Sequence, residues 1–576
     1  MSVCVLHSLP ACLPGLSVSR YLYTRRLHAG LLEAARSHGE RTALVDPSGR
    51  HTYRQLLARA AALAGRLRRA APEPGSRVAV LAPPGHQFVS AQWAVWMAGH
   101  VAVPLCGAHP TSQHRYYLDD SQSAAVVGTE ETAAQLETAV ADSRLPLLLA
   151  DGETTAEGGA EGEGGAEGEG GAEREGEEVG SREDHQPAVI LYTSGTTGPP
   201  KGVVLTHGNL LSQTRDMVSA WQWQPSDVIL HTLPLHHTHG LINALACPLY
   251  VGAKCVMLPS FDAEKVWYHL LDTVSDPAEQ VNVFTAVPTI YAKLLEHYDS
   301  KSRNNFAYQS FVKDVCKSKI RVMISGSAAL ARPILDRWEA ATGHRLLERY
   351  GMTETGMVLT NPLHGHRVPG AVGRPFPSVS VRVARFEPGV SGYTTLAEAD
   401  GSGACTVTPG CEDQEGELLV RGPSLFSGYW RRPEVTAREF TADGWFRTGD
   451  TARLSDGVFS ILGRTSVDII KTGGFKISAL DVERRLLEHP EVQDVAVVGL
   501  PDLTWGQKVA AVVVSSAELD LAGLKQWCGD QLPPYAAPTV LKVLPQMPRN
   551  AMGKVNKKQL VKDLFPEPGT APAAGA

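Results

Sequence analysis

The chain has 576 residues, too many for one hydrophobic core, so two or more domains are expected. Hydrophobic residues make up 43% of it and aromatic residues 7%, which are ordinary values for a soluble globular protein. The net charge of −7 comes from one segment, since residues 152–184 carry eleven Glu and one Asp against two Arg. The near-neutral remainder argues against nucleic acid as a partner.

The N-terminus has the composition of a targeting segment. The first 32 residues contain no Asp or Glu but include four Ser and the basic residues Arg20, Arg25 and Arg26. This composition predicts a mitochondrial transit peptide, assigned to residues 1–29, and therefore a location in the matrix. The alternative is a disordered leader segment that has no targeting function. No later segment has the long uncharged apolar run of a membrane helix, so no membrane span is expected.

Residues 152–184 form a segment of low complexity. A six-residue unit rich in Gly and Glu is repeated over residues 158–175. Because Gly and Glu cannot bury apolar surface, we expect a solvated surface loop here and not a domain boundary. The nine cysteines are scattered without a CxxC pair, which suits a reducing compartment.

The first half of the chain alternates between strand and helix patterns. Residues 77–85 predict a buried strand ending in a turn, residues 86–100 a helix and residues 100–105 a second strand. This order indicates a parallel α/β layer. Residues 187–195 predict a strand that enters a Gly-rich turn, and a helix follows over residues 209–221, with Asn209 as its N-cap.

Further α/β units are predicted over residues 281–298 and 319–343, and short strands with turns begin near residue 370. A compact α+β pattern begins at residue 475. The predicted fold class is therefore α/β: a large N-terminal domain with a short-stranded β subdomain, and a small mobile α+β C-terminal domain. The expected boundaries are residues 30–463, residues 464–565 and a disordered tail over residues 566–576.

The most specific motif is YTSGTTGPPKG, residues 192–202. Its glycines, hydroxyls and single lysine suit a phosphate, yet it lacks the Gly-Lys-Ser/Thr of the P-loop. The string resembles the phosphate-binding loop of the ATP-dependent adenylate-forming superfamily, which includes acyl-CoA synthetases, luciferases and peptide-synthetase adenylation domains. The resemblance implies these ATP-binding residues: Thr193, Ser194, Gly195, Thr196, Thr197, Gly198 and Lys201.

Four further strings resemble motifs of the same superfamily and occur in the same order along the chain. They are YGMTET (350–355), GWFRTGD (444–450), GRTSVDIIKTGGFKIS (463–478) and PRNAMGKVNK (548–557). The resemblance covers nearly everything from about residue 30 to residue 565. It implies that a carboxylate attacks the α-phosphorus of ATP, a step that needs cations and Mg²⁺ to neutralise developing charge.

The resemblance also implies roles for single residues. Lys554 would reach the substrate carboxylate and the α-phosphate, Glu354 would bind magnesium and Thr353 would contact phosphate. Asp450 would accept both ribose hydroxyls, because a carboxylate can take two hydrogen bonds. Each residue also has an ordinary alternative. Lys554 could be a surface lysine, and Asp450 a turn residue. The alternative for Glu354 and Thr353 is a helix-cap pair. Two more residues complete the ATP site: Tyr350 would stack on the adenine, and Arg464 would contact the ribose or a phosphate.

In this superfamily the C-terminal domain rotates after adenylation, which is a conformational gate of a known type. Gly473 and Gly474 would then line the channel for the thiol of coenzyme A. The hinge segment is apparently one residue longer than in relatives, so that either Ser466 or Val467 could be the hinge.

Two stretches indicate which carboxylic acid is the substrate. LPLHHTHG (233–240) lies where the family lines its acyl pocket, which makes His237 a pocket candidate; the alternative is a structural histidine. Arg321 precedes a turn that contains Ser327, and the surrounding string resembles malonyl-CoA synthetases, the mitochondrial form above all. An unpaired arginine would suit a second substrate carboxylate. The alternative is a strand-end arginine paired with a local carboxylate.

These features predict a two-step ligase. Malonate and ATP would give malonyl-AMP and pyrophosphate, and coenzyme A would then give malonyl-CoA and AMP. No room remains for the carrier domain that follows peptide-synthetase adenylation domains. The motifs alone do not exclude a luciferase. Two further alternatives are a synthetase for methylmalonate or another short acid, and a binding protein that retains its contacts with ATP or acyl-CoA but lacks turnover.

Overall fold

The computed structural model describes residues 27–150, 185–193, 199–549 and 554–566, apart from residues 142, 144, 388, 391 and 530. The predicted acidic loop and nearly all of the predicted transit peptide and tail lie outside these residues. Helix α1 (Leu27–Ser37) begins inside the segment 1–29 that we assigned to the transit peptide. No helix among the described residues is long and apolar enough to cross a membrane.

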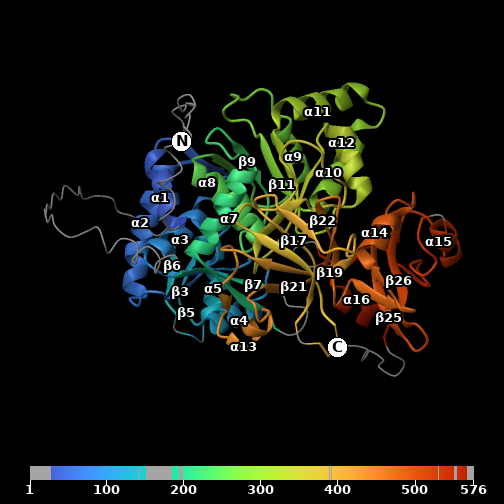
Figure 1. Ribbon diagram of the computed structural model, residues 1–576. Coiled ribbons are helices and arrows are strands. Elements are labelled where there is room, and N and C mark those ends of the chain that lie inside the picture. The colour runs from blue at the N-terminus through green and yellow to red at the C-terminus, as the bar shows by residue number, and fades with distance from the viewer. Residues whose placement is uncertain are drawn as a thin grey trace, which may run out of the picture.

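A seven-stranded sheet forms one half of the N-terminal region (Figure 1). Its strands, in spatial order, are β20 (Gly428–Tyr429), β8 (Lys201–Thr206), β7 (Pro187–Thr193), β4 (Val101–Pro104), β3 (Arg77–Val80), β5 (Ser123–Gly128) and β6 (Leu147–Leu149). The predicted strand–helix–strand unit is confirmed: β3 and β4 are parallel and joined by α3 (His86–Met97). Residues 152–184 connect β6 and β7, which belong to this one sheet.

A second sheet, of nine strands, contains the strands whose loops form the candidate site. Its order is β15 (Arg374–Pro375), β14 (Gly356–Thr360), β13 (Leu347–Met352), β12 (Val322–Ser325), β11 (Val283–Ala286), β9 (Val228–His231), β10 (Lys254–Met257), β1 (Thr42–Asp46) and β2 (Gly49–Thr52). The strands from β13 to β1 pair in parallel, and the pairs at both edges are antiparallel. Parallel strands end at a common edge, so the loops after β9, β12 and β13 come together there.

Helices cover the two sheets. Every residue from 88 to 96 in α3 is buried, as expected of a helix packed on all sides. One core cluster joins residues of both sheets with residues of the helices between them. The other helices of this region are α2 (Tyr53–Ala70), α4 (Thr111–Ser121), α5 (Glu130–Val140), α7 (His207–Ala220), η1 (His239–Ala246), α8 (Cys247–Val251), α9 (Ala263–Leu270), α10 (Pro288–Ser302), α11 (Phe306–Lys319), α12 (Arg332–Thr342) and α13 (Pro433–Arg438).

The short-stranded subdomain is a six-stranded antiparallel sheet. Its order is β18 (Cys405–Val407), β17 (Thr394–Asp400), β16 (Ser380–Arg385), β19 (Glu415–Arg421), β21 (Phe446–Ser455) and β22 (Val458–Arg464). Strand β22 is the last element before the C-terminal region. The linker to the C-terminal region therefore begins at the end of this sheet, beside the nine-stranded sheet.

The C-terminal region forms a separate lobe with its own apolar core, drawn in orange to red in Figure 1. Its sheet contains β24 (Phe475–Ser478), β23 (Ile469–Thr472), β26 (Gly506–Ser515), β25 (Val492–Asp502) and β27 (Val540–Val543). Its helices are α14 (Ala479–Leu486), α15 (Leu521–Cys528) and α16 (Lys557–Leu564). The α+β character predicted for this region is thus confirmed.

One helix start was predicted wrongly. Helix α7 begins at His207, and its N-cap is Thr206, not Asn209. The Thr206 Oγ1 accepts a hydrogen bond from the Asn209 backbone N–H at 3.1 Å, while the Asn209 side chain accepts one from the Thr206 N–H at 2.9 Å. This reciprocal capping box places the polar Asn209 three residues inside the helix.

The cap makes a testable contribution to stability. We expect Thr206→Ala to lower the free energy of unfolding by about 1 kcal/mol, because one helix N–H loses its acceptor. Denaturant unfolding would measure the loss. The control is Ser219→Ala on the exposed end of α7, which should stay within about 0.5 kcal/mol of wild type. Equal losses in both variants would contradict the capping role.

Candidate active site

The YGMTET and GWFRTGD motifs meet at Asp450. In the β21–β22 pair, Asp450 lies opposite Arg464, whose Nε is 3.1 Å from the Asp450 Oδ1. The Tyr350 hydroxyl, from β13, donates to the Asp450 Oδ2 at 2.5 Å. Burial raises the pKa of Asp450, and the positive charge of Arg464 acts in the opposite direction. These three predicted ATP-site residues therefore form one cluster around a buried carboxylate.

Glu354 lies in the turn between β13 and β14, next to the half-buried Thr353. Its carboxylate is buried and accepts a hydrogen bond from the Tyr429 hydroxyl at 3.0 Å. Burial raises the pKa of Glu354, while Arg464 and Lys201 oppose that shift. Among the described residues, no cationic side chain forms an ion pair with it. A buried carboxylate with unused acceptor capacity fits a bound cation.

The phosphate-loop motif joins two antiparallel strands. Thr193 ends β7 and lies opposite Lys201, which begins β8. Residues Ser194, Gly195, Thr196, Thr197 and Gly198 lie outside the described residues. The Lys201 ammonium is 4.0 Å from the centre of the Tyr429 ring and 4.0 Å from a Glu439 carboxylate oxygen. Tyr429 thus contacts both Lys201 and Glu354, which ties the base of this loop to the YGMTET turn.

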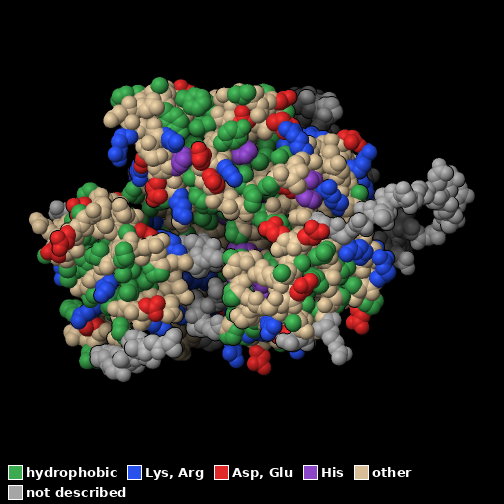
Figure 2. Space-filling view, turned by 180° about the vertical axis from the view of Figure 1, so that it is seen from behind, with side chains coloured by type: hydrophobic (Ala, Val, Ile, Leu, Met, Phe, Trp, Pro, Cys, Tyr) green, Lys and Arg blue, Asp and Glu red, His purple; other side chains and the backbone are tan. Residues whose placement is uncertain are grey.

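Lys554 comes to this cluster from the C-terminal lobe. Desolvation lowers its pKa, Arg464 and Arg349 lower it further, and Asp450 and Glu354 oppose them. The side chain keeps solvent exposure, in accord with a position between the lobes. Figure 2 shows a furrow between the C-terminal lobe, at the left of that view, and the rest of the molecule. The structure therefore brings Lys554 to the same buried charges as the predicted nucleotide residues.

The linker between the lobes is anchored on both sides. Toward the N-terminal region, Thr465 Oγ1 lies 2.9 Å from Thr451 Oγ1. Toward the C-terminal lobe, the Lys557 ammonium is 2.5 Å from Asp468 and 2.7 Å from Glu483. The two hinge candidates, Ser466 and Val467, lie between these anchors, and the Val467 backbone N–H donates to the Arg464 carbonyl at 3.0 Å.

Gly473 and Gly474 form the tip of the β23–β24 hairpin in the C-terminal lobe. Both have positive φ, +54° and +86°, which side chains other than glycine adopt with strain. A Cβ on Gly473 would lie 3.0 Å from the Trp505 ring. The backbone N–H of Gly473 donates to the Trp505 carbonyl at 2.9 Å. The hairpin tip is thus a tight turn with a defined shape.

Arg321 is held inside the protein. Its Nε and Nη2 each donate to a different oxygen of Asp227 at 2.7 Å, and its Nη1 donates to the Trp221 carbonyl at 2.8 Å. These contacts agree with the alternative we considered, a strand-end arginine paired with a local carboxylate. The bidentate face of the guanidinium is therefore not open to a substrate, and the structure does not support the expected pairing.

Arg349 has the properties that we expected of Arg321. It lies in β13, immediately before Tyr350, and is only 4% exposed. Its Nε and Nη2 are buried and have no hydrogen-bond partner among the described residues. Burial lowers its pKa to about 9. The sequence carried a signal that we missed, since a charged pair, Glu348-Arg349, directly precedes the YGMTET motif.

The wall beside Arg349 comes from the loops after β9 and β12. A Cβ on Gly326 would lie 2.5 Å from the guanidinium, so glycine leaves the room that Arg349 occupies. Ser327 has a φ of +69°, and its Oγ is 3.2 Å from the His239 Nδ1. The other His239 nitrogen is 2.7 Å from the Thr285 hydroxyl. Sequence reasoning missed His239, although it lies inside LPLHHTHG.

His237 lies in the same wall. Its Nε2 is shielded from solvent and has no hydrogen-bond partner among the described residues. Burial holds the pKa values of His237 and His239 well below the ordinary value, and the charge of Lys554 lowers both further. Both rings are therefore neutral near pH 7. Contacts and electrostatic interactions thus place one group of residues together, with an excess of positive charge: His237, His239, Ser327, Arg349 and Lys554.

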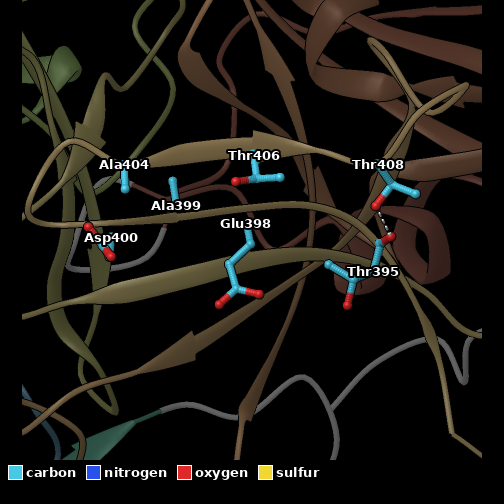
Figure 3. Close-up of a pocket in the computed structure, with 7 residues that line it drawn as sticks. All are labelled: Thr395, Glu398, Ala399, Asp400, Ala404, Thr406 and Thr408. Carbon is cyan, nitrogen blue, oxygen red and sulfur yellow. Dashed lines mark hydrogen bonds between the residues drawn. The ribbon is translucent and has the colours of Figure 1, made fainter.

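A pocket elsewhere contains none of the motif residues. It lies on the β17–β18 hairpin, and Figure 3 shows its lining: Thr395, Glu398, Ala399, Asp400, Ala404, Thr406 and Thr408. Its acids have local partners, because Glu398 accepts from Arg382 at 2.6 Å and Asp400 accepts from the Ser402 backbone. We therefore assign the active site to the motif cluster.

Known proteins are similar to this chain over most of its length. The chain is 50% identical over 540 residues to the mitochondrial malonate–CoA ligase ACSF3 of Mus musculus, covering 92% of this chain and 90% of that protein. ATP-bound MatB of Rhodopseudomonas palustris is 31% identical, with a TM-score of 0.77 and coverage of 94% and 99%. A malonyl-CoA ligase with bound methylmalonyl-CoA and AMP is 34% identical, with a TM-score of 0.58 and coverage of 88% and 97%.

The family matches span most of the chain. Residues 31–430 match the AMP-binding enzyme family, and residues 481–554 match the C-terminal domain of AMP-binding enzymes. The second match ends at Lys554, the residue that the structure brings to the nucleotide cluster. The predicted resemblance is thereby confirmed, and the chain belongs to the AMP-binding enzyme family.

Proposed function

We propose that this protein is an AMP-forming malonate–CoA ligase. The observation that carries the proposal is the buried guanidinium of Arg349, which has no carboxylate partner among the described residues and lies close enough to Lys554 to lower the pKa of that lysine. A buried charge without a partner is costly. A small dicarboxylate would supply one carboxylate to Arg349 and present the other to Lys554. The names of the malonate-specific relatives support the same substrate.

In the first half-reaction, one malonate carboxylate attacks the α-phosphorus of ATP, and the bond to the β-phosphate breaks. Lys554 would neutralise charge on the attacking carboxylate and the α-phosphate, as preorganised cations do in acyl-adenylate formation. Lys201 and the loop after Thr193 would hold the departing pyrophosphate. Asp450 would accept hydrogen bonds from the ribose hydroxyls, beside Tyr350 at the adenine.

Mg²⁺ belongs to this step as a bound cofactor. The buried carboxylate of Glu354, which forms no ion pair among the described residues, fits this ion, and Thr353 is its neighbour in the same turn. When bound, the ion supplies positive charge to the phosphate oxygens. Glu354 would hold it, and the Tyr429 hydroxyl, which donates to Glu354, would orient the carboxylate.

In the second half-reaction, the thiol of coenzyme A attacks the acyl carbon of malonyl-AMP, and AMP leaves. Lys554 must withdraw to admit the thiol, so the C-terminal lobe must rotate. Both Ser466 and Val467 lie between the anchors at Thr465 and Asp468, so the rotation would be absorbed across the two residues together. The Gly473-Gly474 tip would then come to the thiol channel.

Methylmalonate is the second candidate acid. The structure of a related ligase contains methylmalonyl-CoA, and Arg349 would serve either dicarboxylate. For location, we infer the mitochondrial matrix. The N-terminal composition and the mitochondrial relatives support that inference.

The proposed reaction predicts AMP release that depends on coenzyme A. With the full chain, ATP and Mg²⁺, malonate should give the highest kcat/KM in a panel of acetate, butyrate, malonate, methylmalonate and succinate. Measurement of AMP and pyrophosphate for each acid would test this. If no short acid releases either product, the enzyme lacks the proposed activity; if acetate exceeds malonate, the dicarboxylate assignment is wrong.

Arg349 provides a sharper test of specificity. Arg349→Met should lower kcat/KM for malonate at least about 100-fold, because the substrate carboxylate loses a buried charge partner, and should change acetate much less. The matched variant is Arg321→Met, which should lower stability while leaving the ratio of malonate to acetate unchanged. If that protein does not fold, Arg321→Lys replaces it. If the Arg321 variant loses the preference for malonate and the Arg349 variant keeps it, Arg321 binds the second substrate carboxylate, as the sequence predicted.

Lys554 should separate the two half-reactions. Lys554→Ala should lower the rate of malonyl-AMP formation by about 10²–10³-fold. Thioester formation from supplied malonyl-AMP should stay close to wild type. Single-turnover measurement of each half-reaction is the check, and Lys558→Ala, on the adjacent helix α16, is the control. Equal losses in both half-reactions would show that Lys554 does not act where we propose.

A further inference from the structure

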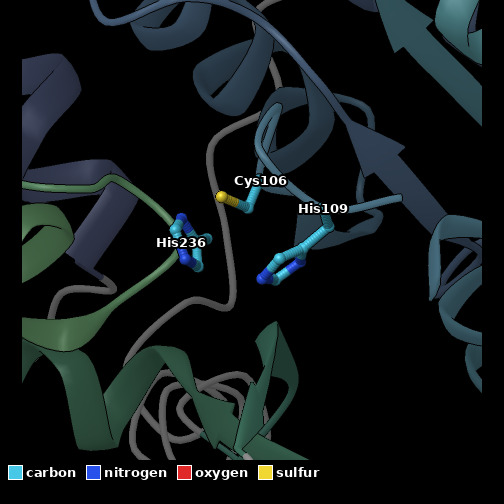
Figure 4. Close-up of side chains that lie close together, drawn as sticks. All are labelled: Cys106, His109 and His236. Atoms are coloured by element: carbon cyan, nitrogen blue, oxygen red, sulfur yellow. The ribbon is translucent and has the colours of Figure 1, made fainter. Parts of the chain in front are cut away.

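A cysteine and two histidines from two different sheets lie together next to the acid pocket. Cys106 and His109 come from the loop between β4 and α4, and His236 comes from the loop between β9 and η1. One ligand atom from each lies within 4.8 Å of the other two. Figure 4 shows the sulfur and both imidazole rings facing the space between the loops. The proposed reaction gives none of the three a role.

The Cys106–His109 turn is rigid. The His109 backbone N–H donates to the Cys106 carbonyl at 3.0 Å, and the His114 Nε2 lies 2.8 Å from the same oxygen. The Gln135 side chain donates to the carbonyls of Gly107 and His109 at 3.1 and 3.2 Å. These bonds fix the turn before any ligand binds, so that little ordering would be needed on binding.

The sulfur has the environment of a metal thiolate. Burial raises the pKa of the Cys106 thiol, whereas hydrogen bonds from the backbone N–H groups of Ala108 and His109 act in the opposite direction. Such N–H donors stabilise a thiolate once a metal ion replaces its proton. Cys106 and His109 are separated by two residues, as are many cysteine pairs of structural zinc sites.

The two imidazoles have unused nitrogens. The His109 Nδ1 and the His236 Nε2 are shielded from solvent, and neither has a hydrogen-bond partner among the described residues. Burial lowers the pKa of both rings, to about 4 for His236, so each is neutral near pH 7. Neutral imidazole is the form that binds metal ions. Shielded nitrogens without partners are unusual and require a reason.

We propose that Cys106, His109 and His236 form a binding site for a single transition-metal ion, with Zn²⁺ as the best fit. One sulfur and two nitrogen ligands suit zinc, and a three-ligand set leaves a fourth position for water. Binding forms a sulfur–metal bond and releases the thiol proton to solvent. The ion adds two positive charges and the thiolate one negative charge, a net +1.

The site would act on the acid pocket through His236. The His236 ring lies 3.9 Å, centre to centre, from the ring of His237, which lines that pocket. A bound ion would fix the orientation of His236 and tie the loop after β4 to the loop after β9. It would therefore hold the pocket wall rigid and add positive charge on the side of the pocket that His237 lines.

Cobalt(II) is the probe for the test, because a cobalt–thiolate bond absorbs in the near ultraviolet. Titration of the full, reduced chain with Co²⁺ should give this absorption with one ion per chain, and Zn²⁺ should abolish it. Cys106→Ser should lose the absorption, and His109→Gln should weaken Co²⁺ binding at least about 10-fold. The control is Cys405→Ser, which removes an exposed cysteine on β18 and should bind as wild type.

Folding is checked by the melting temperature of each variant without metal, which should match wild type. A thiolate absorption that survives Cys106→Ser would overturn the proposal. So would wild-type protein that shows no cobalt–thiolate absorption at millimolar Co²⁺. Because the readout is spectroscopic, its outcome is independent of whether the malonate–CoA ligase activity is found.

Discussion

The position of Lys554 depends on how the linker between the lobes is held. On one side Arg464 is paired with Asp450, and on the other Lys557 is paired with Asp468 and Glu483. Only residues 465–467 lie between these ion pairs, so the C-terminal lobe has few ways to move. A lobe connected in this way can present one surface or another to the same site, which is what two successive reactions require.

Charged groups at the site divide into paired and unpaired sets. Arg321 and Asp227 satisfy each other through two bonds and stabilise a strand end. Arg349 is buried and has no such partner in the part of the chain that the structure describes, although an unpaired buried charge destabilises a fold. Groups with perturbed pKa values cluster at functional sites. In the proposed function, Arg349 therefore binds the substrate, whereas Arg321 has a structural role.

The sequence predicted what is local and missed what depends on distant pairing. Apolar runs predicted β3, α3 and β4, and ordered motifs predicted Tyr350 and Asp450, because each is encoded within a few residues. Which arginine is unpaired is not local, since it depends on Asp227, 94 positions from Arg321. The helix cap at Thr206 was missed for a smaller reason: Thr and Asn both cap helices, and only the backbone geometry distinguishes them.

Selection of a dicarboxylate in such a site would come mainly from a penalty on other acids. A monocarboxylic acid could still reach Lys554, but its apolar end would face Arg349 and displace water from the guanidinium without replacing its hydrogen bonds. A site built around a polar group rejects an analogue that lacks its partner far more strongly than an apolar pocket rejects a smaller one. One buried arginine can thus define the substrate class, while the neutral His237 and His239 rings shape the pocket without adding charge.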